Sequence, residues 1–546
     1  MLNTFLLSLR PEIKYFFNLT HMKYLPLVLL LVAQTSLLKA EETALKFEAE
    51  DGSMSKSEIV SDAKYSGGKA VKMTDAAASL TINAEITEGK KYSVFIMAEG
   101  IGGEKVVNCS VNGAATSFKT NNYGEVEIGT FILETGENSI TITPNWTWFN
   151  VDYIRLEEYG QGLTFDISSV PVTPDASESA QKLYTFLYEN FGKRTISGMM
   201  TGSMDNTDGK DVCSHEDIKA VFDVSGYNPA LVGFDFMNAT GKDVDAGNNW
   251  FIGYTQKIIG LAKDVWKNGG IPDFSWHWRD PSRKTGDFYS EKATFKFTDA
   301  MNADGSWNTS STLYKNLIKD IDIIADYFLD LQNEGIACIF RPLHEAPGGW
   351  FWWGTQGAEA YTKLFRLVFD EMVKVKGVKN VIWDWNADYT LTDSWCPGAE
   401  YYDVISTDIY NKPFDYSSNY PAFDKLKALS GGKKLITLAE NGPIPDIDKQ
   451  EEEEAMWSWW MPWYQSWDGK FVNQTSKEEW QKCMSDERII TLDRMPGWDA
   501  ESSISAIEAI NPQVDYCYNL NGMRSNDIKK GKIRLINGRK IILFDL

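Results

Sequence analysis

Short runs in which hydrophobic and polar residues alternate fill the chain from about residue 44 onward. Residues 78–83, 92–97, 106–111 and 139–143 are such runs, rich in β-branched side chains and separated by Gly and Asn turns. A period of two is typical of strands that bury one face. The pattern predicts an antiparallel β-sandwich of the jelly-roll kind over residues 44–158.

The rhythm changes after a Gly-rich break, and residues 159–170 are predicted to form a linker. Between residues 171 and 498, continuous apolar runs alternate with helical patterns such as the amphipathic stretch 314–331. Eight such runs lie at residues 195–198, 230–236, 270–276, 336–340, 381–384, 404–408, 435–438 and 455–460. Eight buried strands alternating with helices predict a (β/α)8 TIM barrel, a fold that carries catalytic residues at the carboxyl ends of its strands.

The beginning of the chain carries a segment outside these two domains. An apolar stretch, residues 25–32, follows Met22 and Lys23 and precedes the segment 34–40, which ends at Ala40, and this order is typical of an export signal. Residues 1–40 are therefore predicted to be a signal region with its true start at Met22. We expect the protein to be extracellular, periplasmic or on the surface of a bacterium. A membrane anchor is the alternative, but the run is shorter than the ~20 residues of a transmembrane span, so no span is expected.

In residues 499–546, at the end of the chain, strand-like and helical patterns no longer alternate. Two strand-like pieces near the terminus flank Asn-Gly pairs, which favour tight hairpin turns. The pattern predicts a C-terminal tail, and both a sorting-related role and a plain detached tail remain open.

Composition narrows the range of partners. The chain has 76 acidic against 54 basic residues, a net charge of -22, so it offers no basic surface to release counterions from a phosphate backbone. Nucleic acid is therefore excluded as a partner. The 20 Trp and 24 Tyr exceed what a barrel core needs, which favours exposed aromatic surfaces and a carbohydrate ligand. The six cysteines have no CxxC spacing, which excludes a zinc ribbon; one disulfide remains possible, but the sequence does not show which cysteines would pair.

Two glutamates stand at the ends of predicted strands. Glu345 closes the fourth run and Glu440 the seventh, and these strands face each other across a barrel mouth. Hydrolysis of a glycosidic bond uses a carboxylic acid to protonate the leaving oxygen and a carboxylate to attack or support the anomeric carbon. A surface charge is the alternative for either residue alone. His277 and His344 also fall at strand ends, where they either bind sugar hydroxyls or are buried structural groups.

Five motifs resemble glycoside hydrolase family 26, which is dominated by β-mannanases. They are Trp-His-Trp at 276–278, Arg-Pro-Leu-His-Glu at 341–345, Gly-Gly-Trp-Phe-Trp-Trp-Gly at 348–354, Thr-Asp-Ile-Tyr at 407–410 and Leu-Ala-Glu-Asn-Gly at 438–442. The resemblance spans roughly residues 170–496. It implies that Glu345 is the acid/base and Glu440 the nucleophile of a retaining double displacement. Ala346 and Pro347 depart from the Met/Asn-type residues associated with the positions after the acid.

The same resemblance implies supporting roles near the two glutamates. Arg341 and His344 would position Glu345 and the glycone. Tyr410, which follows Asp408 on the sixth strand, would hydrogen-bond the nucleophile, and Asp408 is included among the substrate-binding residues.

Aromatic residues would complete the sugar site. His277 and Trp350 would flank the sugar beside the cleaved bond. Trp463 would be the stacking platform after the eighth strand, with Trp459 or Trp460 as the alternatives.

The N-terminal sandwich resembles a family 35 carbohydrate-binding module over nearly all of residues 45–158. The resemblance rests on residues 47–50 (Phe-Glu-Ala-Glu), 65–71 and 146–154. It implies a structural Ca²⁺ held by Glu48, Glu50 and Asp152, since Ca²⁺ prefers carboxylate oxygens. Solvent-facing charges on an edge strand are the alternative.

Sugar contact in this module is expected in the loop before its last strand. Trp146, Trp148 and Asn150 lie there in the resembling pattern. The alternative is that these are core residues, because alternation points only some of them outward.

We therefore expect a secreted endo-β-1,4-mannanase, a monomer that needs no cofactor for catalysis and acts on mannan, galactomannan or glucomannan. The rival readings are a β-glucanase (lichenase) or xylanase on the same scaffold, an inverting hydrolase, and a non-catalytic glycan-binding surface protein. An inverting enzyme would need its two carboxyl groups ~6.5–9.5 Å apart, whereas a retaining one needs ~5–5.5 Å.

Overall fold

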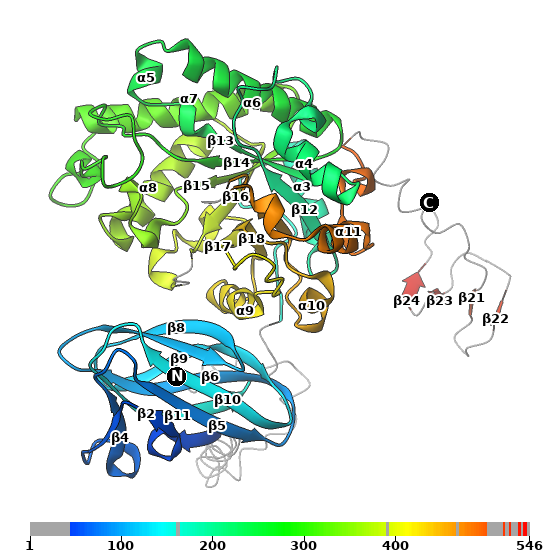
Figure 1. The fold of residues 1–546 in the computed structure, drawn as a ribbon. Coiled ribbons are helices and arrows are strands. Elements are labelled where there is room, and N and C mark those ends of the chain that lie inside the picture. Colours follow the sequence, from blue (N-terminus) through cyan, green and yellow to red (C-terminus); the bar gives the residue numbers. More distant parts are fainter. Residues whose placement is uncertain are drawn as a thin grey trace, which may run out of the picture. The chain divides into compact units, whose positions relative to one another are not determined.

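The computed structural model describes residues 44–159, 164–388, 392–465 and 469–498 (Figure 1). Beyond them it gives only the backbone of four short strands, Cys517–Tyr518, Arg524–Ser525, Ile533–Ile536 and Arg539–Ile542. The chain divides into two compact units, of which the first ends at Thr164 and the second begins at Phe165. The predicted signal region, residues 1–40, lies outside the described residues. In the part of the chain that is described, no helix has the length and apolar character needed to cross a membrane.

The first unit is the predicted β-sandwich, made of two antiparallel sheets. One sheet has the order β3-β4-β11-β6-β9, with β1 also paired to β11, and the other has the order β2-β5-β10-β7-β8. Every second residue of a strand points into the space between the sheets; Leu80, Ile82 and Ala84 of β5 are buried there. The bounds are β1 (Ala44–Glu48), β2 (Ser53–Ser55), β3 (Glu58–Ser61), β4 (Lys69–Met73), β5 (Ser79–Ile86), β6 (Lys90–Gly100), β7 (Lys105–Val111), β8 (Ala114–Thr120), β9 (Gly124–Leu133), β10 (Gly136–Pro144) and β11 (Phe149–Glu158).

The second unit is a closed barrel of eight parallel strands, which confirms the predicted (β/α)8 fold. The hydrogen-bonded order runs from β13 through β19 to β12, and β12 pairs with β13 to close the ring. The strands are almost wholly buried, as expected for a parallel sheet covered on both faces. They are β12 (Thr195–Met200), β13 (Leu231–Asp235), β14 (Ile271–Trp276), β15 (Cys338–Pro342), β16 (Val381–Asn386), β17 (Val404–Ile409), β18 (Leu435–Asn441) and β19 (Trp459–Pro462). The last strand begins four residues later than its apolar run predicts.

Helices cover the outside of the barrel (Figure 1). Several begin at a capping serine whose side chain accepts a backbone N–H of the first turn, as at Ser177, Ser311 and Ser476. The helices are α3 (Glu178–Asn190), α4 (Glu216–Ser225), α5 (Lys242–Asp245), α6 (Asn249–Lys267), α7 (Thr312–Asn333), α8 (Ala358–Asp370), α9 (Tyr420–Leu429), α10 (Ile447–Glu452) and α11 (Lys477–Ser485). Each helix that follows a strand starts near the carboxyl end of that strand, so helix starts gather around the barrel mouth.

Part of the predicted linker belongs to the barrel. The ring of Phe165 lies 4.9 Å from that of Phe191, and the backbone N–H of Asp166 donates to the carbonyl of Gly432 at 2.9 Å. The linker prediction is therefore wrong for residues 165–170, because an aromatic side chain in a polar stretch supplies an apolar contact that composition alone does not reveal. The five cysteines whose side chains are described are free thiols.

In the tail, β23 (Ile533–Ile536) pairs antiparallel with β24 (Arg539–Ile542), and β21 (Cys517–Tyr518) with both β22 (Arg524–Ser525) and β23. Ile536 stands opposite Arg539, which is the register of a hairpin. The predicted Asn-Gly turn between these two strands lies outside the described residues.

Candidate active site

A sharp turn after β15 carries Glu345 over the barrel mouth. Leu343 and Glu345 both adopt left-handed backbone conformations, with φ of 54° and 53°. Such conformations cost roughly 1–2 kcal/mol for residues other than glycine, so neighbouring contacts must hold them. One such contact is visible, since the backbone N–H of Glu345 donates to Oδ1 of Asn386 on β16 at 3.0 Å. The turn therefore aims the Glu345 side chain at the strand ends opposite.

Three carboxylates meet at the mouth. Glu345, Asp408 and Glu440 each place one oxygen within 4.8 Å of the others. Burial, followed by the negative charge of Glu440, raises the pKa of Glu345 to about 7. The indole N–H of Trp350 donates to Oε2 of Glu345 at 2.8 Å and partly offsets this rise. Glu345 is thus suited to carry a proton near neutral pH.

Glu440 has two strong donors. The guanidinium of Arg341 donates to Oε1 of Glu440 and, at 3.1 Å, to Oδ2 of Asp408, and the hydroxyl of Tyr410 donates to Oε2 of Glu440. Burial disfavours the charge of Arg341, but the two carboxylates outweigh it and hold the pKa of Arg341 well above its usual range. These two donors fix the orientation of the Glu440 carboxylate.

The structure corrects the role expected for Arg341. The resemblance assigned Arg341 to positioning Glu345, but the guanidinium contacts Glu440 and Asp408 instead. The reason is the direction of the strand, because Arg341 is still within β15 and points into the barrel, whereas Glu345 lies beyond the turn. Arg341 is therefore a positioning group for Glu440.

Asp408 is also a positioning group and not an exposed sugar ligand. Its carboxyl is buried and accepts from Arg341 through Oδ2 and from the amide of Asn386 through Oδ1, at 2.9 Å. Burial raises the pKa of Asp408 well above its usual range, although Arg341 opposes the rise. Asn386 was missed by the sequence analysis, since the predicted run stopped at residue 384, two residues short of the strand end.

A buried pair of histidines lies beside the carboxylates. Nε2 of His277 is 3.2 Å from Nε2 of His344, and Nδ1 of His277 contacts a carboxylate oxygen of Asp235 at the end of β13. The two facing Nε2 atoms are within hydrogen-bond distance, so one of them carries the shared proton. His344 thus meets His277 and not Glu345 as expected. Asp235 was also not identified as a site residue from the sequence, although an aspartate near the end of an apolar run suggests a position at the barrel mouth.

The two histidines differ in their electrostatic surroundings. Burial disfavours the charged form of His277, but the carboxylate of Asp235 outweighs it and raises the pKa of His277. Burial, reinforced by the positive charges of His277 and Arg341, lowers the pKa of His344 well below its usual range. His344 is therefore held in its neutral form.

Aromatic rings wall the site. Trp463 is partly exposed, and its ring centroid lies 6.1 Å from that of His277. Trp459 and Trp460 are fully buried in the hydrophobic interior, so neither can stack on a sugar. The ring centroid of Phe351, a residue that the sequence analysis did not single out, lies 5.1 Å from that of His277.

Residues 172–494, more than half of the chain, match glycosyl hydrolase family 26. The chain belongs to glycosyl hydrolase family 26. Residues 45–159 match carbohydrate binding module family 35.

Relatives of this family 26 chain carry mannanase names. A mannan endo-1,4-beta-mannosidase of Thermothelomyces thermophilus is 29% identical over 84% of this chain and 91% of its own length. A β-mannanase from a symbiotic protist of the termite Reticulitermes speratus is 36% identical, with a TM-score of 0.54, over 61% of this chain and 99% of that one. A ruminal family 26 endo-β-1,4-mannanase is 26% identical, with a TM-score of 0.60. The match covers 84% of this chain and 99% of that one.

The family 35 module exposes two of its predicted sugar contacts. Trp146 and Trp148 expose 54% and 51% of their surfaces. Asn150, expected in the loop, lies instead in β11, where its amide is buried and donates to the Tyr65 hydroxyl at 2.7 Å. The predicted loop position of Asn150 is therefore wrong, because β11 already begins at Phe149, and sugar contact through Asn150 stays a prediction.

The predicted calcium ligands surround a turn at Ser66 and Gly67. The N–H of Ser66 donates to both oxygens of Asp152 at 3.0 Å, and its hydroxyl donates to Oε1 of Glu48 at 2.7 Å. Glu48 and Glu50 each keep one buried carboxylate oxygen that meets no hydrogen-bond donor among the described residues, which fits a hard cation. The fit of Asp152 is poorer, since the three carboxylates do not bring one oxygen each within 4.8 Å of the others.

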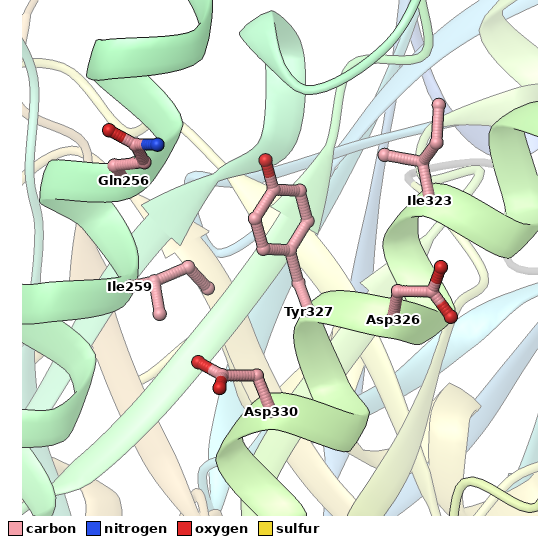
Figure 2. Close-up of a pocket in the computed structure, with 6 residues that line it drawn as sticks. All are labelled: Gln256, Ile259, Ile323, Asp326, Tyr327 and Asp330. Atoms are coloured by element: carbon pink, nitrogen blue, oxygen red, sulfur yellow. The ribbon is translucent and has the colours of Figure 1, made fainter.

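A pocket of about 420 Å³ lies away from the family 26 catalytic site, on the outer wall of the barrel (Figure 2). Residues of α6 and α7 line it, among them Ile259, Ile323 and Tyr327. None of its lining residues lies at a strand end, so this pocket is not part of the catalytic site.

Proposed function

We propose that this chain hydrolyses internal β-1,4-mannosidic bonds of mannan, galactomannan or glucomannan with retention of configuration. The observation that carries the proposal is the pair Glu345 and Glu440, whose nearest oxygens lie within 4.8 Å. This spacing is closer to the ~5–5.5 Å of a retaining pair than to the ~6.5–9.5 Å of an inverting one. The mannosidase names of the relatives favour mannan over β-glucan or xylan.

In the first step, Glu440 attacks the anomeric carbon as an anion oriented by Arg341 and Tyr410. Glu345 gives its proton to the glycosidic oxygen as the bond to the leaving sugar breaks. The products are a glycosyl ester on Glu440, an ionised Glu345 and a sugar chain with a free hydroxyl.

In the second step, Glu345 acts as the base. The negative charge of Glu440 contributes to the raised pKa of Glu345, and the ester removes that charge. The pKa of Glu345 falls accordingly, so it can accept a proton from water as the oxygen attacks the anomeric carbon. Cleavage of the ester frees the Glu440 carboxylate, leaves Glu345 protonated for the next cycle and releases the sugar with its original configuration.

Initial rates on soluble mannan test the proposal. We expect Glu345→Ala and Glu440→Ala each to lower turnover by at least about a hundredfold. Glu359→Ala, which removes a carboxylate that is 86% exposed on α8, should leave the rate unchanged. Full activity in either active-site variant would sink the assignment.

The stereochemistry gives a second readout. The first product of wild-type hydrolysis, followed by NMR, should be the β-anomer, and an α-anomer first would mean inversion. With azide ion, Glu345→Ala should form the β-azide and Glu440→Ala the α-azide, because azide replaces water in one case and the nucleophile in the other. Parallel assays on lichenan and xylan decide the substrate class.

Four further properties belong to the proposal. We propose that residues 1–40 direct export from a bacterial cell and that the protein acts as a monomer. We also propose that the family 35 module binds the polysaccharide through Trp146 and Trp148 and holds a structural Ca²⁺. The exposure of the two indoles and the unpaired oxygens of Glu48 and Glu50 support the last two points.

A further inference from the structure

Trp250 is the one exposed tryptophan among the described residues of the barrel unit, with 51% of its surface in solvent. Its position is at the mouth. It stands in the first turn of α6, which follows β13 and returns to β14, and the guanidinium of Arg279, three residues beyond β14, lies 5.0 Å from the ring of Phe251. The start of α6 is therefore level with the carboxyl ends of the strands, where the catalytic groups lie.

The exposed indole is held in place. Its N–H donates to Oδ1 of Asp205 at 3.0 Å, and Asp205 is itself fixed by the Ser203 hydroxyl at 3.1 Å. The rings of Phe251 and Tyr254 pack against the indole, with centroids 5.2 and 5.4 Å away. A large aromatic side chain that is both exposed and rigid is preorganised to bind, because it loses little conformational freedom when a ligand covers it.

Trp250 is also continuous with the aromatic wall of the catalytic site. The Tyr254 hydroxyl donates to the carbonyl of Gly202 at 2.8 Å, and the ring of Tyr464 packs so closely on Gly202 that an added Cβ would clash with it at 2.4 Å. The ring centroid of Tyr464 in turn lies 5.4 Å from that of Trp463. A series of contacts thus runs from His277 through Trp463 and Tyr464 to the support of Trp250.

We propose that Trp250 is a distal platform on which a mannose unit of the bound polysaccharide, remote from the cleaved bond, stacks. The inference rests on the proposed mannanase function. The apolar C–H face of a sugar ring matches the indole face, and the exposed carboxylate of Asp205 beside it can accept a bond from a sugar hydroxyl. The platform adds binding only for chains long enough to reach it.

The test compares short and long linear β-1,4-manno-oligosaccharides as substrates of the full chain. We expect Trp250→Ala to lower kcat/KM for the hexasaccharide about 2- to 10-fold and to leave that for the trisaccharide unchanged. Trp250→Phe, which keeps a ring, should recover part of the loss. Phe222→Ala removes a side chain that is 47% exposed near the far end of α4 and should leave both substrates unaffected.

The outcomes separate this inference from the proposed function. If the wild type does not cut the oligosaccharides, both fall. If it cuts them and Trp250→Ala changes neither rate, or lowers both equally, only the platform is overturned. A loss confined to the longer substrate supports it.

Discussion

The indole nitrogen of Trp350 donates a 2.8 Å hydrogen bond to Oε2 of Glu345. A donor on a carboxylate favours the ionised form, whereas burial and the charge of Glu440 favour the protonated one. Trp350 therefore does more than wall the site, because it limits how far the pKa of the proposed acid/base can rise.

Replacing Trp350 with Phe removes this hydrogen bond and keeps a ring. The pKa of Glu345 should then rise above about 7, and the alkaline fall of kcat/KM should move to higher pH. The pH–rate profile on mannan measures the shift. Trp480→Phe is the control, because it removes a similar indole bond, to the carbonyl of Val472, within the fold away from the site. An alkaline limb that moves to lower pH, or not at all, would contradict the expected role.

Arg341→Met should destabilise the barrel and abolish most of the activity. The substitution leaves the buried carboxylates of Asp408 and Glu440 without their cation, and breaking a buried pair costs about 3–5 kcal/mol. The loss should grow as pH rises, because Arg341 opposes the rise in the pKa of Asp408, and without this cation the buried Asp408 carboxyl must ionise at a greater cost.

Urea unfolding at about pH 5 and about pH 8 measures this change. Arg283→Met breaks another buried ion pair, with Asp320, and should also lower stability while kcat stays close to that of the wild type. Equal stability of Arg341→Met at both pH values would show that the carboxylates do not depend on this cation.

Asp384→Asn should stabilise the protein near neutral pH. Burial raises the pKa of Asp384 to about 8, and no hydrogen-bond donor among the described residues reaches either oxygen in good geometry, although Ser406 lies nearby. The folded pKa lies above the ordinary value of about 3.9, so this group costs stability progressively as pH rises from about 4 to about 8. Asn cannot ionise. The variant should gain at least about 1 kcal/mol in unfolding free energy at pH 7, and a smaller gain at pH 5. A variant less stable than the wild type at both values would rule this out.

Removing divalent cations should lower the thermal midpoint of the family 35 module. A ligand that binds only the folded state stabilises it, so chelation by EDTA and restoration by Ca²⁺ should move the unfolding transition in opposite directions. Glu50→Gln should make the transition insensitive to EDTA, because it removes one of the unpaired oxygens. No change in calorimetry with EDTA would end the calcium proposal.

The barrel was predictable because its strands are parallel and buried on both faces, which produces continuous apolar runs that stand out from the amphipathic helices between them. The same property makes it hard to tell from sequence which tryptophan near the end of the eighth strand is accessible to a ligand. Trp459, Trp460 and Trp463 look alike in sequence, and only the end of β19 at Pro462 leaves Trp463 outside the buried interior. The first residues of the barrel unit were misplaced because Phe165 finds its partners, Phe191 and Phe423, far along the chain.

By itself the sequence determined the two domains, the order of the strands and the positions of Glu345 and Glu440 at strand ends, since periodicity and motifs are local properties. Only the tertiary structure decided which groups meet. Arg341 pairs with Glu440, and His344 with His277, because those contacts depend on the register and direction of neighbouring strands. The pKa of Glu345 is likewise a tertiary property, because burial and the charge of a residue 95 positions later in the chain set it together.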